Sequence, residues 1–145
     1  MNQAEIEKVV DERYGVSPSG LSAVFVKLSD NWGIKLFWEE DLRDEVYAKQ
    51  ELFLEHGYAP ELGEKVDIML GRADQRYGYI TERVEVLCNP DWPYTMLWAN
   101  QHPEEARELE DLNDWLCENV AEIDDMHAGN WGIKNGKYIP IDFGG

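Results

Sequence analysis

The chain has 145 residues, of which 30 are acidic and 13 are basic, so its formal net charge is −17 at pH 7. This charge argues against direct binding to DNA or RNA and against docking on anionic membranes, because both need a surplus of cations. Hydrophobic residues make up 43% of the chain and aromatic residues 12%, which indicates a folded protein. Two distant cysteines (Cys88 and Cys117), a polar N-terminus and the lack of a long apolar run predict a cytoplasmic protein with reduced thiols.

The first part of the chain predicts one helix and then a β-hairpin. Apolar residues at helical spacing predict a helix over residues 4–13. Residues 15–20, Gly-Val-Ser-Pro-Ser-Gly, break it, and they fit either a plain turn or a phosphate-binding loop that offers few backbone N–H groups. Two β-like runs at 23–28 and 33–38, joined by a polar turn at 29–32, predict the hairpin.

A second helix is predicted over residues 39–56, because three acids begin it and Gly57 and Pro60 follow it. Two further strands are expected at 62–68 and 78–84, with a turn at 71–76 between them.

The longest predicted helix covers residues 104–122, after a turn at 89–93 and a short helix or coil at 94–100. Pro103 suits the first position of a helix, and leucines at 109, 112 and 116 form an apolar stripe. Residues 101–125 hold ten acids and one base. Most of these acids are expected on a solvated face, and such a face can bind a basic partner.

The C-terminal segment contains the pattern most closely tied to chemistry. Asp125 is followed five positions later by Asn130, and Asp142 comes twelve positions after that in the triplet Asp142-Phe143-Gly144. A carboxylate, an amide and an Asp-Phe-Gly in this order are typical of phosphoryl transfer, in which oxygen ligands hold Mg²⁺ against the phosphates of ATP. The segment from 125 to 130, Asp-Met-His-Ala-Gly-Asn, resembles the catalytic loop of the protein-kinase-like superfamily, in the style of aminoglycoside phosphotransferases.

This resemblance implies an α+β fold. Residues 1–85 would form an antiparallel N-lobe with one inserted helix, and residues 86–145 a truncated, mostly helical C-lobe. Asp125 would be the catalytic base, and Asn130 and Asp142 the Mg²⁺ ligands. ATP would be held by Lys35, with Lys27 as the competing candidate, and by the hinge backbone around Glu82 and Val84. Glu45 would pair with Lys35, with Glu51 as the alternative.

Two features depart from the family pattern. The chain stops after the Asp-Phe-Gly, so the activation segment and the later C-lobe helices are missing, and a homodimer or a protein partner is expected to cover the face they would occupy. The glycine-rich loop is also poor. The sequence therefore supports two hypotheses. One is a minimal ATP- and Mg²⁺-dependent phosphotransferase. The other is a catalytically silent, kinase-like acidic protein (a pseudokinase) that binds and modulates a partner, for example by imitating nucleic acid.

Overall fold

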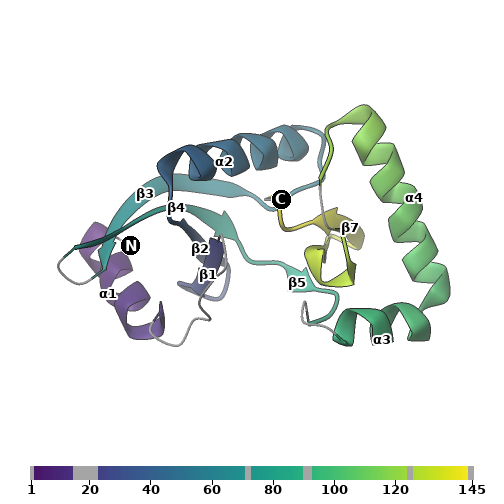
Figure 1. Cartoon of the computed structure of the whole chain (residues 1–145), viewed down its shortest axis with the longest axis horizontal. Coiled ribbons are helices and arrows are strands. Elements are labelled where there is room, and N and C mark those ends of the chain that lie inside the picture. The colour runs from purple at the N-terminus through teal and green to yellow at the C-terminus, as the bar shows by residue number, and fades with distance from the viewer. Residues whose placement is uncertain (1, 15–22, 71–72, 90–92, 124–125, 144–145) are drawn as a thin grey trace. The chain divides into compact units, whose positions relative to one another are not determined.

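The computed structural model describes residues 2–14, 23–70, 73–89, 93–123 and 126–143. Over these residues the chain has four α-helices, a four-stranded antiparallel sheet and a small three-stranded antiparallel sheet, which confirms the α+β class (Figure 1). The chain divides into two compact units: Met1–Ala48 with Glu61–Arg83, and Lys49–Pro60 with Val84–Gly145. The interpretation of the chain as two kinase lobes that meet at residue 85 stays a prediction.

The first unit is built on the four-stranded sheet. Its strands lie in the order β1 (Ala23–Lys27), β2 (Trp32–Phe37), β4 (Asp74–Glu82) and β3 (Leu62–Leu70). Helix α1 (Gln3–Tyr14) precedes the sheet in the chain, and helix α2 (Glu40–Glu55) is inserted between β2 and β3. The predicted first helix, the hairpin and the inserted helix are confirmed to within two residues at each end.

One face of this sheet packs against α1. Ile6 and Val10 of the helix lie in a buried cluster with side chains from β1, β2 and β3, and these strands contribute every second residue because side chains alternate across a sheet. The strand members of the cluster are Val26, Ile34, Leu36, Val66, Ile68 and Leu70. Burial of these apolar side chains stabilises the packing of α1 on the sheet.

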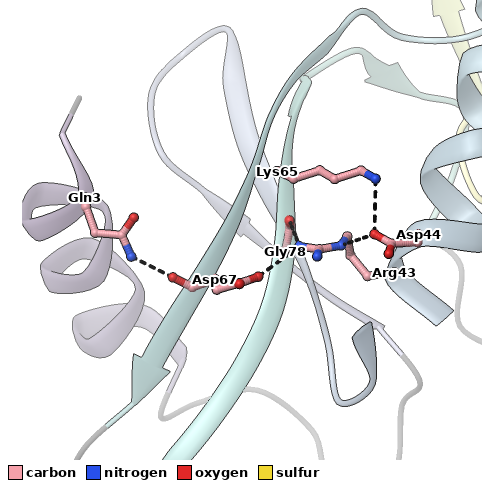
Figure 2. A network of polar contacts seen from close by, with 6 residues as sticks. All are labelled: Gln3, Arg43, Asp44, Lys65, Asp67 and Gly78. Atoms are coloured by element: carbon pink, nitrogen blue, oxygen red, sulfur yellow. Dashed lines mark hydrogen bonds and ion pairs between the residues drawn. The ribbon is translucent and has the colours of Figure 1, made fainter. Parts of the chain in front are cut away.

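The opposite face carries the first half of α2. Tyr47 meets Tyr79 of β4 edge-on, with ring centroids 5.3 Å apart, and Tyr79 is fully buried. Arg43 is also buried, and its guanidinium donates hydrogen bonds to the carbonyl of Gly78 and to the carboxylates of Asp44 and Asp67 (Figure 2). A buried cation is tolerated only when it is paired and hydrogen-bonded, and here three oxygens satisfy it.

Strand β4 is longer than the sequence predicts. The turn expected at 71–76 is wrong beyond residue 73, because Asp74 already pairs with Leu70 and Gln75 with Met69. The first residues of β4 are polar, so the sequence pattern there does not indicate a strand. Arg76 is nevertheless buried, because its guanidinium lies 3.2 Å from the ring centroid of Trp38.

Helix α2 ends where Gly57 predicts. The backbone N–H of Tyr58 bonds to the carbonyl of Phe53, and the N–H of Gly57 bonds to that of Leu54, while Gly57 has a φ of +80°. This pair of bonds is a Schellman motif, in which glycine adopts the left-handed conformation at little steric cost.

The second unit contains α3 (Tyr94–Gln101), α4 (Pro103–Asn119), the 3₁₀ turn η1 (Ala128–Asn130), and a sheet in the order β5 (Glu85–Val86), β6 (Trp131–Lys134) and β7 (Lys137–Pro140). Helix α4 begins at Pro103, as its sequence indicates, but it ends at Asn119, three residues before the predicted end at 122. Strand β5 was not predicted, since two residues carry no periodic pattern. No helix in the described part of the chain is long and apolar enough to cross a membrane.

Candidate functional site

The β6–β7 hairpin lies between the two predicted metal ligands, Asn130 and Asp142. Asn135 and Gly136 form its two-residue turn with φ values of 53° and 74°, which match a type I′ turn and the strong preference of that turn for Asn-Gly. The last paired residues at the open end are Trp131 and Pro140. Asn130 immediately precedes the first of these, and Asp142 follows two residues after the second.

A backbone hydrogen bond continues the hairpin beyond its last strand pair. The N–H of Ile141 donates to the carbonyl of Asn130 over 3.0 Å. Asn130 is buried, with 8% of its surface exposed, whereas Asp142 is exposed. The hairpin therefore places the backbone of Asn130 opposite Ile141, the residue directly before Asp142.

The turn that ends at Asn130 is capped by His127, a residue to which the sequence analysis gave no separate role. His127 caps η1, and its Nδ1 accepts a hydrogen bond from the backbone N–H of Gly129 over 3.1 Å. An accepting Nδ1 leaves the ring proton of the neutral imidazole on Nε2. His127 is part of the segment at 125–130 that resembles a catalytic loop, but the sequence pattern alone does not show that it caps the turn.

The sequence pattern assigns Asn130 and Asp142 to Mg²⁺, a metal that prefers oxygen ligands. Among the described residues, no group of three or more His, Cys, Asp or Glu side chains is placed to hold a metal ion. Mg²⁺ binds through only one or two carboxylates and takes its other oxygens from water and phosphate. The assignment of Asp142 and Asn130 as ligands of Mg²⁺ stays a prediction.

Lys35 lies near the middle of β2, in the first unit, and its side chain is half-buried. Its Nζ lies 5.9 Å from the ring centroid of Tyr79, so it is on the α2 side of the sheet. Phe25 pairs with it across β1 and β2 and is 47% exposed. The Phe25 ring covers Gly33. A Cβ atom at position 33 would come within 2.1 Å of the ring, so the absence of a side chain there leaves room for Phe25. The competitor Lys27 is paired with the exposed Asp30 at the end of β1.

Glu45 is exposed on α2. It lies two residues after Arg43, about 200° around the helix from the side chain that bonds to β4, so it points away from the sheet. The alternative, Glu51, is also exposed and follows Tyr47 by one helical turn. Glu51 belongs to the second unit, and the assignment of either glutamate to Lys35 stays a prediction.

The predicted hinge falls at the end of β4. The N–H of Glu82 donates to the carbonyl of Glu61 over 2.9 Å, and its carboxylate accepts from the N–H of Glu61. The amide of Glu82 is thus used within the sheet, and adenine would have to meet other backbone groups of the segment. Val84 precedes β5, and its side chain lies over Gly132 of β6, where a Cβ atom would be 2.8 Å from Val84 Cγ2.

Some predicted residues lie outside the described part of the chain. They are the catalytic base Asp125, the loop at 15–20 and Gly144. The fold thus joins Asn130 to Asp142 in one unit and places Lys35 in the other.

No family model matches this chain, and the searches of curated proteins and of solved structures likewise found nothing similar to it.

Proposed function

We propose that the chain is a kinase-like phosphotransferase that uses ATP and Mg²⁺. The observation that supports this proposal is the Ile141–Asn130 backbone bond, because it pairs the asparagine of the D-x-x-x-x-N pattern with the residue directly before the aspartate of the Asp-Phe-Gly. The order of elements around it supports the same conclusion. A helix is inserted in an antiparallel sheet after the strand that bears Lys35, and a long helix precedes the catalytic segment.

The proposed roles follow from residue chemistry. Asn130 and Asp142 would hold Mg²⁺, and the ion when bound would neutralise charge on the phosphates of ATP. Asp125 would accept the proton of the acceptor hydroxyl, and Lys35, which belongs to the other unit, is proposed as a phosphate contact. Phosphoryl transfer needs little covalent chemistry from the protein, so positioning of these groups accounts for most of the expected rate.

Thermal unfolding with and without ATP and Mg²⁺ tests the nucleotide site. ATP at about a hundred times its Kd stabilises a protein by roughly 2.7 kcal/mol, which is a rise of several degrees in Tm for a domain of this size. We expect this rise for the wild-type protein with Mg²⁺, and a much smaller one without metal or in Asp142→Asn. The matched control is Asp11→Asn, an exposed residue of α1 that should keep the full response.

Two results would refute the proposal. One is the absence of any rise at millimolar ATP with Mg²⁺. The other is an equal rise in wild type and Asp142→Asn, which would mean that nucleotide binds elsewhere. If binding is established, release of ADP that is lost in Asp125→Asn while the Tm response is retained would separate catalysis from binding.

A further inference from the structure

We propose that the groove between α3 and α4 is a docking site for a basic segment of a partner protein that inserts an apolar side chain. The groove has a volume of about 310 Å³ and is walled by α3, by α4 and by residues 126–128 before Trp131. None of the residues assigned above to ATP or Mg²⁺ lines it. This proposal therefore stands or falls separately from the phosphotransferase.

The walls of the groove are largely apolar and adaptable. Trp98 comes from α3, Leu109 from α4, and Met126 from the segment before η1. Met96 of α3 also lines the groove and is 43% exposed. Methionine and tryptophan are well suited to receive an apolar side chain, because the thioether is flexible and the indole offers a large contact area. The same helix exposes Tyr94 and Leu97, so the apolar surface extends beyond the groove itself.

One flank of the groove is strongly acidic. Helix α4 carries seven acidic residues and one basic residue. Glu110 lines the groove, and Asp114 and Glu118 continue from it at intervals of four residues, so the three side chains form a row along one side of the helix. All three are exposed, and none forms an ion pair within the described residues.

Like charges at this spacing repel one another and destabilise a helix. A partner that brings lysine or arginine side chains along this row would relieve the repulsion while its apolar side chain fills the groove. The complementarity is therefore specific: one apolar residue flanked by cations. A second copy of this chain does not meet the requirement, because each copy carries a net charge of −17.

The probe is a fluorescein-labelled helical peptide made of leucine and lysine, and binding is followed by fluorescence anisotropy at two NaCl concentrations. A matched peptide has serine in place of every leucine and keeps the same charge. We expect the leucine peptide to bind at least about tenfold more tightly, and the difference to persist when salt screens the lysines.

Three sets of variants locate the site. Neutralisation of the row in E110Q/D114N/E118Q should weaken binding of the leucine peptide about tenfold, whereas D11N/E12Q/E64Q, which removes three exposed acids of the other unit, should weaken it less than about threefold. Ala106→Trp places a large side chain on the α4 wall and should block the groove. If Ala106→Trp does not fold, Ala99→Leu should block the groove from the α3 wall instead. Circular dichroism and Tm establish that each variant is folded.

Three outcomes would overturn the proposal. Equal affinity for the leucine and serine peptides would mean that only charge is recognised. Equal effects of the two neutralised sets would mean that no particular surface is used. A dimer in sedimentation velocity that Ala106→Trp dissociates would mean that a second copy occupies the groove.

Discussion

Phe143 packs against Phe53, with their ring centroids 5.2 Å apart and both side chains almost completely buried. Phe143 directly follows Asp142, and Phe53 lies near the end of α2, in the same compact unit. The exposed carboxylate proposed to hold Mg²⁺ is therefore next to a side chain fixed in the core of that unit. This contact restricts where Asp142 can move.

Truncation of either ring should be costly. Phe53→Ala and Phe143→Ala are each expected to lower the free energy of unfolding by about 3–5 kcal/mol, because each leaves a large cavity. In a double-mutant cycle the two losses should fall short of additivity by about 0.5–1.5 kcal/mol, the usual coupling of an aromatic pair. Urea unfolding measures both quantities. Strictly additive losses would show that the rings do not interact, and Phe143→Leu is the conservative control.

Arg43 should be the most sensitive charged residue of the first unit. Arg43→Ala leaves the carbonyl of Gly78 without its donor and separates α2 from Asp67, so we expect a loss of about 2–4 kcal/mol in unfolding free energy. Lys65→Ala removes the more exposed cation of the same network and should cost less than about 1 kcal/mol. Similar losses for the two variants, measured by urea unfolding, would contradict the arrangement in Figure 2.

The network also predicts a dependence of stability on acid pH. Hydrogen bonds from Arg43 and then Lys65 hold the pKa of the Asp44 carboxyl below its ordinary value of 3.8. A lowered pKa in the folded state stabilises the protein above the unfolded pKa, and this contribution is lost as pH falls through the folded pKa. The difference in stability between wild type and Asp44→Asn should therefore be constant above about pH 5 and shrink below about pH 4. A difference that grows in acid would refute the assignment.

At alkaline pH, Tyr138 reports on the charge of α4. Burial and the nearby carboxylates of Glu108 and Glu105 raise the pKa of the Tyr138 phenol above 10.0. Glu108→Gln should lower this pKa, and Glu104→Gln should leave it unchanged, as followed by ¹³C NMR of labelled tyrosine. Since the unfolded state loses this proton first, the contribution of Tyr138 to stability falls as pH rises above 10. No change in Glu108→Gln would place that carboxylate too far away to act.

The turn of the β6–β7 hairpin can be tested through its backbone. Gly136→Ala puts a Cβ at a φ of +74°, where the surroundings are open but the conformation is strained, so a loss of about 1–2 kcal/mol is expected. Asn135→Gly should be nearly neutral, because glycine adopts the same conformation. If the hairpin positions Asn130 and Asp142, Gly136→Ala should also weaken the Mg²⁺-dependent response to ATP.

Several parts of this fold could be predicted from the sequence because their causes are local. Pro103 and Gly57 mark the helix ends they occupy, and Asn135-Gly136 specifies the turn that brings Asn130 toward Asp142. Other parts depend on partners far away in the chain. The polar start of β4 is a strand because β3 lies beside it, and β5 exists only through its pairing with β6. The direction of the Glu45 side chain depends on which face of α2 packs on the sheet. The bond from Arg43 to Gly78 sets that face, and no local sequence pattern predicts it.

The hairpin has a consequence for how the proposed metal site is assembled. Only the ten residues from 131 to 140 separate Asn130 from the residue that bonds to it, and two of them form the turn. Closing so short a loop costs little chain entropy, and hairpins of this kind form within about 1–10 μs. The backbones of Asn130 and Ile141 can thus meet early in folding, before the longer-range pairing of β2 with β4 is made. Mg²⁺ would then encounter its protein ligands as a single local element of the chain.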